Sequence, residues 1–171
     1  MDTTRHTVAD TRLGAITLVA DGDAVTGLYF HHHVRRPDPR TFGPAVEPAA
    51  DPLLAAAAEQ LHDYLDRRRD SFDLPLRTAG DAFQEKVWAA LRAIPYGSTT
   101  TYGRLAEQLG DRRLAQRVGQ AVGANPLCVL VPCHRVVGAD GSLTGYAGGL
   151  RRKQELLELE EPAEVAAARL F

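Results

Sequence analysis

Hydrophobic positions in the first third of the chain follow two different spacings. Residues 13–20 and 24–30 are rich in β-forming side chains and flank Asp21-Gly22-Asp23, which is typical of a β-hairpin. Residues 53–66 instead repeat Leu and Ala at helical spacing, with Leu54, Ala57, Leu61 and Leu65 on one stripe. The pattern predicts a small sheet followed by a helix.

After residue 80 the pattern changes to short helices. Residues 82–94 place apolar side chains on one helical face. Two shorter helices are expected over about 102–109 and 112–123, separated by Gly110-Asp111, and such a pair resembles a helix-turn-helix. A last helix is expected over about 150–160, ending before Pro162.

The less regular segments also carry information. Residues 35–52 hold several prolines and are expected to be a loop, and the charged, turn-rich residues 67–80 are expected to be a linker. Residues 127–131 are a short apolar run that we expect to be a strand. Residues 138–149 contain five glycines, which predicts a loop with unusual backbone angles or a close approach to a ligand.

The two cysteines flank most of the apolar run of residues 127–131, since Cys128 is its second residue and Cys133 follows its end. In a strand, Cys128 and Cys133 would point to opposite faces, which argues against a disulfide between them. Two cysteines also exclude a disulfide framework and a four-thiolate metal site. Free thiols fit a reducing compartment, and we expect a cytoplasmic protein because the N-terminus lacks the apolar segment of a secretory signal.

Composition and charge narrow the class of protein. The 171 residues allow one large domain or two small ones, and no apolar run reaches the roughly 20 residues of a membrane helix. The net charge is −2, but residues 81–153 hold ten basic and five acidic side chains. A basic half on an acidic chain is typical of polyanion binding, although chance clustering on a solvated surface gives the same count.

Cys133 is the candidate nucleophile. It follows Pro132 and precedes His134 and Arg135, and nearby cationic groups favour the reactive thiolate. His134 could accept the thiol proton, directly or through a water, if an acid oriented its ring. A buried cysteine considered by itself is more often an inert core residue.

The surrounding residues favour the reactive interpretation. Together they resemble the signature of the methylated-DNA–protein-cysteine methyltransferases (alkylguanine-DNA alkyltransferases), through about residues 80–162. The matching motifs, in chain order, are Phe83-Gln84, Val87-Trp88, Ile94-Pro95-Tyr96-Gly97, Thr101-Tyr102-Gly103, Val118-Gly119, Asn125-Pro126, Pro132-Cys133-His134-Arg135-Val136-Val137, Gly145-Tyr146-Ala147-Gly148-Gly149, Lys153, Leu156-Leu157 and Glu160.

The resemblance implies an α+β fold in three parts. Residues 1–79 would form a variable N-terminal domain with a small β-sheet and a helix, ribonuclease-H-like in the family. Residues 80–162 would form a mainly helical DNA-binding and catalytic domain, like a winged helix or helix-turn-helix. Residues 163–171 would be a C-terminal tail.

The resemblance also implies catalytic roles. Cys133 would accept the alkyl group, His134 would deprotonate it through a water, and Glu160 would orient His134, a variant of the triad logic. Tyr102 would help to rotate the nucleotide and to protonate the leaving base. No cofactor and no metal would be needed.

Further residues would bind the substrate and the duplex. Tyr146 would line the base pocket, backbone groups near Ala147 would bind the guanine edge, Asn125 would fix the turn after the recognition helix, and Lys153 would add positive potential. The residues expected to contact DNA are Arg113, Gln116, Arg117 and Arg135.

The sequence departs from the family pattern at several positions. The family usually has Arg two residues before Val118-Gly119, where it fills the gap left by the flipped base, but this chain has Gln116 there and Arg117 one place later. One residue turns a helix by about 100°, so we expect Gln116 to fill the gap. Ala147 replaces a Ser of some relatives. N-terminal cysteines for zinc are absent, and His31-His32-His33 is expected to be surface histidine.

The implied function is DNA repair by stoichiometric transfer of an alkyl group from guanine oxygen in double-stranded DNA to Cys133, by a monomer that is consumed. The range of alkyl groups, repair of alkylated thymine and cooperative assembly on DNA stay open. The alternatives are a lesion-binding module without transfer activity, a transcription regulator and a cysteine hydrolase. The presence of Cys133 argues against the lesion-binding module. A transcription regulator would need an extra metal or sensor domain, which 171 residues do not supply.

Overall fold

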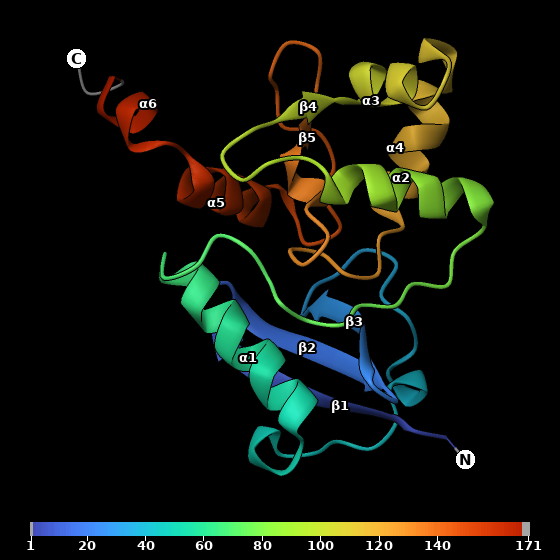
Figure 1. Ribbon diagram of the computed structural model, residues 1–171, viewed down its shortest axis with the longest axis vertical. Coiled ribbons are helices and arrows are strands. Elements are labelled where there is room, and N and C mark those ends of the chain that lie inside the picture. The colour runs from blue at the N-terminus through green and yellow to red at the C-terminus, as the bar shows by residue number, and fades with distance from the viewer. Residues whose placement is uncertain (1, 169–171) are drawn as a thin grey trace.

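The N-terminal part is a three-stranded antiparallel sheet covered by one helix (Figure 1). The computed structural model describes residues 2–168. Strands β1 (Thr4–Thr11), β2 (Gly14–Asp21) and β3 (Ala24–Phe30) lie in the order β1-β2-β3. Helix α1 (Pro52–Leu65) packs on the sheet, and the Asp51 side chain caps it by accepting a hydrogen bond from the Leu54 amide.

The β2–β3 hairpin and helix α1 were predicted and are confirmed, whereas β1 was not predicted. In β1 the buried side chains are Thr7 and Ala9, while Val8 is exposed. The apolar alternation that marks a half-buried strand is therefore missing from this edge strand. Hydrogen bonding to β2 therefore makes this segment a strand, although its own sequence does not indicate one.

The expected loop and linker both contact the sheet. Residues 35–52 include two short 3₁₀ helices, η1 (Pro39–Phe42) and η2 (Pro48–Ala50). The linker over 67–80 runs beside β3, where the Val25 amide donates to the Pro75 carbonyl and the Arg77 amide donates to the Val25 carbonyl. These hydrogen bonds hold the linker against the sheet before the second part begins.

The C-terminal part consists of short helices around a two-stranded parallel ladder. Its helices and strands are α2 (Ala82–Arg92), β4 (Thr100–Thr101), α3 (Tyr102–Gln108), η3 (Arg112–Leu114), α4 (Ala115–Gly123), η4 (Cys133–Arg135), β5 (Val136–Val137), α5 (Leu150–Glu160) and α6 (Ala163–Ala168). The predicted helices are confirmed with shifted ends. The expected tail contains α6, and its residues 169–171 lie outside the described part.

The strand expected over residues 127–131 is wrong. These residues form a tight turn in which the Val131 amide donates to the Leu127 carbonyl at 2.8 Å. Val129 has φ of 74°, a conformation that a β-branched residue rarely adopts. The Asn125 side chain bridges the turn by donating to the Val131 carbonyl and accepting from the Leu127 amide, both at 2.9 Å. This pairing replaces a strand ladder.

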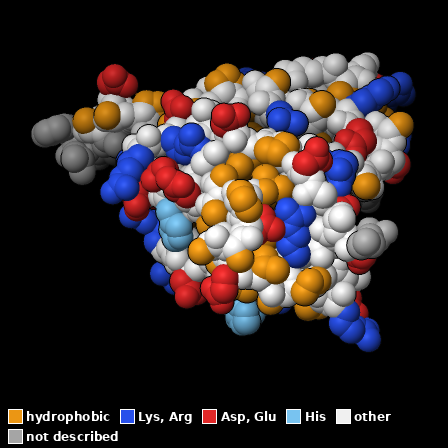
Figure 2. All heavy atoms as spheres, turned by 60° about the horizontal axis from the view of Figure 1, so that its bottom comes forward, with side chains coloured by type: hydrophobic (Ala, Val, Ile, Leu, Met, Phe, Trp, Pro, Cys, Tyr) orange, Lys and Arg blue, Asp and Glu red, His pale blue; other side chains and the backbone are white. Residues whose placement is uncertain are grey.

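One hydrophobic core joins the two parts. A single cluster of buried side chains extends from β2 and β3 through α1 and α2 to α5, and the Leu28 amide donates to the Pro126 carbonyl across the boundary. The fold is α+β. Helices long and apolar enough to cross a membrane do not occur within residues 2–168. On the face formed by the sheet end of the molecule, acidic and basic side chains are interspersed (Figure 2).

Candidate active site around Cys133

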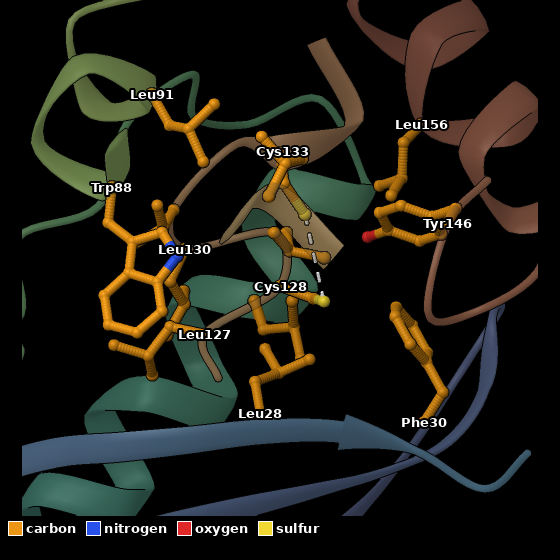
Figure 3. Packing of buried hydrophobic residues seen from close by; sticks show 14 of the residues in the cluster. Leu28, Phe30, Trp88, Leu91, Leu127, Cys128, Leu130, Cys133, Tyr146 and Leu156 are labelled. Atoms are coloured by element: carbon orange, nitrogen blue, oxygen red, sulfur yellow. Dashed lines mark hydrogen bonds between the residues drawn. The ribbon is translucent and has the colours of Figure 1, made fainter. Parts of the chain in front are cut away.

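Cys133 begins a single 3₁₀ turn at the centre of the molecule. The Cys133 amide donates to the Val131 carbonyl at 2.8 Å, and its side chain is buried. Its sulfur lies 3.9 Å from the Cys128 sulfur (Figure 3). The expectation that these cysteines point to opposite faces is therefore wrong, because the turn at Val129 brings them to the same side. Both are free thiols.

The surroundings of Cys133 favour its anion. A hydrogen bond from the Cys128 thiol lowers the pKa of Cys133, which outweighs the opposing effect of burial. The Lys153 ammonium lowers it further. Burial lowers the pKa of Lys153 itself to about 8. The Lys153 side chain is fully buried, and its Nζ donates to the Thr144 carbonyl at 2.9 Å.

His134 and Glu160 form a buried pair beside Cys133. His134 Nε2 donates to Glu160 Oε2 at 2.8 Å, and both side chains are almost completely buried. Burial lowers the pKa of His134 more than the nearby carboxylate raises it, so the imidazole is neutral near pH 7. Burial alone would raise the pKa of Glu160, but the hydrogen bonds from Arg135 and His134 hold it at about 2.

These protonation states fix the tautomer of His134. Ionised Glu160 can only accept, so Nε2 of the neutral ring must carry the hydrogen and Nδ1 must carry the lone pair. Nδ1 is buried and has no hydrogen-bond partner among the described residues. A neutral imidazole with a bare lone pair has the proton-accepting form that a general base requires, and His134 directly follows Cys133 in the chain.

Arg135 is not placed to contact DNA, contrary to our expectation. Its Nε and one terminal nitrogen donate to the two Glu160 oxygens at 2.7 and 2.8 Å, and the other terminal nitrogen donates to the Ile94 carbonyl at 2.6 Å. The side chain is buried against these partners. A DNA phosphate could bind Arg135 only by breaking this bidentate ion pair with Glu160. Arg135 therefore binds the Glu160 carboxylate instead.

Tyr64 of α1 is a site neighbour that the sequence did not indicate. Its hydroxyl donates to Glu160 Oε2, and the side chain is 1% exposed. The contact spans 96 positions of the chain, from the N-terminal helix to the last residue of α5. Tyr64 occupies the apolar stripe of an ordinary amphipathic helix, so its sequence context suggests a core residue only.

A cavity of about 540 Å³ lies beside Tyr146, between α4, the glycine-rich loop and the segment after β3. Its lining residues are Val34, Arg35, Tyr102, Ala115, Gln116, Gly119, Gln120, Val122, Gly123, Gly145, Tyr146 and Ala147. The expected pocket residues Tyr102, Tyr146 and Ala147 therefore meet here. Val34 and Arg35 come from the N-terminal part and were not predicted.

Tyr146 lines this cavity and also faces the two cysteines. Its hydroxyl points toward the two sulfur atoms (Figure 3). Tyr102 begins α3, and its hydroxyl accepts from the Thr144 hydroxyl at 3.0 Å. Thr144, which the sequence did not single out, thus contacts both Tyr102 and Lys153.

The expected DNA-contacting residues on α4 and the preceding turn point in different directions. Gln116 is exposed and lines the cavity. Arg117 stacks on the Phe83 ring of α2, with its guanidinium carbon 4.1 Å from the ring centroid. Arg113 is highly exposed and forms an ion pair with Asp111. Of these three side chains, that of Gln116 is the one that lines the cavity.

The histidine run provides no metal site that the described residues could complete. His31 and His32 are exposed and contact each other, while His33 is partly buried and its Nδ1 accepts from the Phe30 amide. Burial lowers the pKa of His33 to about 4. A cluster of three or more candidate ligands does not occur within residues 2–168.

The geometry can be compared with known proteins. The family model for "6-O-methylguanine DNA methyltransferase, DNA binding domain" matches residues 82–162. A methylated-DNA–protein-cysteine methyltransferase of Mycolicibacterium paratuberculosis is 43% identical over 166 residues, covering 97% of this chain and 98% of the relative. One from Mycobacterium tuberculosis is 41% identical over 162 residues, covering 95% of each.

Solved structures give the same result. The crystal structure of Mycobacterium tuberculosis OGT in complex with DNA superposes with a TM-score of 0.82 at 39% identity, covering 94% of this chain and 97% of that one. A Methanococcus jannaschii O6-methylguanine DNA methyltransferase superposes with a TM-score of 0.64 at 28% identity, covering 90% and 92%. This chain belongs to the methylated-DNA–protein-cysteine methyltransferase family.

Proposed function

We propose that the protein repairs DNA by moving an alkyl group from the exocyclic oxygen of a guanine onto Cys133, and that it is consumed in doing so. The observation that carries this proposal is the bare, buried Nδ1 of neutral His134, whose ring is fixed by Glu160 next to a thiol of lowered pKa. This arrangement creates a thiolate without a cofactor.

The reaction follows from the nature of the two partners. The thiolate attacks the alkyl carbon, the carbon–oxygen bond breaks, and the guanine leaves with the electron pair. A donor at the leaving base stabilises that charge, and we assign this role to the Tyr102 hydroxyl at the cavity wall. The product is a thioether, which no neighbouring group can hydrolyse, so the protein reacts once.

Access to the guanine oxygen requires that the nucleotide leaves the base stack. Flipping costs a few kcal/mol, which duplex contacts must offset. We assign the cavity beside Tyr146 as the receiving pocket, with backbone groups near Ala147 reading the base edge. Asn125 fixes the turn between α4 and Cys133, and Lys153 adds positive charge that acts on Cys133.

The division into residues 1–79, 80–162 and 163–171 is part of the proposal, as are a ribonuclease-H-like N-terminal part and a winged-helix arrangement of the second part. Free buried thiols and a chemistry that needs them reduced support a cytoplasmic location. We further propose that a monomer acts on double-stranded DNA.

Methylated duplex DNA provides the direct test. After incubation with DNA containing O6-methylguanine, the peptide of residues 118–135, which no Lys or Arg interrupts before Arg135, should gain the mass of one methyl group. Fragmentation should place that methyl on Cys133 and not on Cys128. Repeated turnover would indicate a hydrolase, and binding without any mass gain would indicate a lesion-binding module.

Gln116 is expected to fill the gap left by the flipped nucleotide. Gln116→Ala should slow repair of duplex DNA by about tenfold while leaving repair of single-stranded DNA nearly unchanged, since only the duplex must be opened. Arg117→Ala is the matched control one residue away, because its side chain stacks on Phe83. A large duplex-specific loss for Arg117→Ala with none for Gln116→Ala would contradict this assignment.

A further inference from the structure

The Cys128 thiol lies against the reactive sulfur although the proposed alkyl transfer does not require a second sulfur there. The two sulfur atoms are 3.9 Å apart, and a disulfide bond is about 2.0 Å long, so closing the bond moves each sulfur by about 1 Å. Figure 3 shows both side chains pointing into the same space in front of Tyr146. We expect rotation of the two side chains to bring the sulfurs together.

The turn that makes this contact is strained. Val129, directly after Cys128, adopts a positive φ, a conformation that is sterically unfavourable for a β-branched residue. The Asn125 side chain holds both ends of the turn, through the Leu127 amide and the Val131 carbonyl. A buried cysteine commonly acts as a small hydrophobic residue. Here, however, a constrained turn aims its sulfur at the one thiol whose chemistry matters.

The two thiols differ in reactivity. Their interaction lowers the pKa of Cys133 and raises the pKa of Cys128, which is also buried. Cys133 is therefore the sulfur that reacts first with an oxidant, because the thiolate is the nucleophilic form. Cys128 stays protonated beside it until an electrophilic sulfur appears.

We propose that Cys128 is a resolving thiol, which converts peroxide-oxidised Cys133 into a reversible Cys128–Cys133 disulfide. The Cys133 thiolate attacks one oxygen of hydrogen peroxide, and the O–O bond breaks to leave a sulfenic acid. The released hydroxide takes up the proton that the Cys133 thiol lost on ionising and becomes water. The Cys128 sulfur then attacks the Cys133 sulfur. The S–O bond breaks, and the thiol proton leaves with the hydroxide as a second water. Peroxide is reduced to water, and the two thiols are oxidised to one disulfide.

The disulfide would protect the acceptor. A sulfenic acid left alone is oxidised further to sulfinic acid, which is irreversible in most proteins. A repair protein that is used once has a single acceptor sulfur to lose. The disulfide blocks alkyl transfer while it lasts, and thiol reductants restore the acceptor by exchange.

The test compares the full chain with Cys128→Ser and Cys128→Ala after exposure to dilute hydrogen peroxide. In the parent protein the peptide of residues 118–135, which contains both cysteines, should become lighter by the mass of two hydrogens and resist alkylation by iodoacetamide. Dithiothreitol should reverse both changes. In both variants the same peptide should instead become heavier by two oxygens, and dithiothreitol should not reverse this.

A second readout is methyl-acceptor capacity, expressed for each protein relative to its own untreated sample. Dithiothreitol should restore most of the lost capacity in the parent protein and little of it in either variant. Serine at position 128 can still donate a hydrogen bond to Cys133, whereas alanine cannot. If both variants lose the protection equally, the protection depends on the Cys128 sulfur and not on its hydrogen bond. A parent peptide that gains two oxygens as fast as the variants, or a disulfide between two chains, would overturn the inference.

The mass readout needs no DNA. The inference concerns the sulfur used in the proposed function, yet the two can fail separately. A chain that forms the disulfide but accepts no methyl group would refute alkyl transfer alone. A chain that accepts a methyl group but forms no disulfide would refute only the role given to Cys128.

Discussion

A His134→Gln variant is expected to accept methyl groups about 10²–10⁴ times more slowly than the parent chain near pH 7, the range typical of a lost general base. Glutamine can still donate a hydrogen bond to Glu160, so the buried carboxylate keeps this partner. It cannot take a proton from Cys133. The loss therefore reports on proton transfer, and the measurement is single-turnover transfer from O6-methylguanine DNA, with circular dichroism to check folding.

The pH dependence distinguishes a base from a structural residue. In the parent chain the rate should hold down to a pH below the ordinary histidine value, since the pKa of His134 is lowered. In the variant the rate should rise as pH increases and the Cys133 thiol ionises without help, so the gap narrows. His62→Gln, on the exposed side of α1, is the control and should change neither rate nor profile. A constant gap at every pH would contradict proton transfer by His134.

The sequence alone was sufficient to select the candidate residues around Cys133, because they occur in short, ordered motifs. Cys133 and His134 are neighbours in the chain, and Glu160 follows at the family spacing on a helix that periodicity predicts. The structure brings His134 and Glu160 within hydrogen-bond distance. Local patterning also sufficed for the β2–β3 hairpin and α1, since each has a regular apolar spacing.

Contacts between distant segments could not be predicted in the same way. Tyr64 reaches Glu160 from the N-terminal part, and Val34 and Arg35 reach the cavity from the loop after β3. Nothing in their local sequence distinguishes them from packing or surface residues. Arg135 shows the same limit, because a basic residue beside a reactive cysteine is equally compatible with phosphate binding and with a buried carboxylate.

The prediction of a strand in the apolar run before Cys133 was wrong for a different reason. Residues 127–131 have strand-forming side chains, but the pairing that would make them a strand is replaced by the Asn125 side chain and by a positive φ at Val129. Side-chain to backbone hydrogen bonds of this kind compete with sheet ladders. Tertiary context decides the outcome, and here it brings Cys128 to Cys133.

The Arg135→Met variant is expected to lose about 3–5 kcal/mol of unfolding free energy, because it leaves a buried carboxylate without its charged partner. Methionine keeps much of the side-chain length but removes both hydrogen bonds to Glu160 and the one to the Ile94 carbonyl. Urea unfolding measures the loss. Arg113→Met is the matched control, since its ion pair with Asp111 is exposed and such pairs contribute about 0–1 kcal/mol.

Acid should reduce the difference between Arg135→Met and the parent chain. The pKa of Glu160 falls from 4.5 to about 2 on folding, which corresponds to about 3 kcal/mol at neutral pH. Because the folded pKa is the lower one, this stabilisation is complete above about pH 4.5 and disappears as pH falls toward 2. Arg135→Met raises the folded pKa of Glu160 and so loses less on acidification. Equal losses for Arg135→Met and Arg113→Met at pH 7, or a difference that grows in acid, would show that Arg135 does not hold Glu160 in its ionised state.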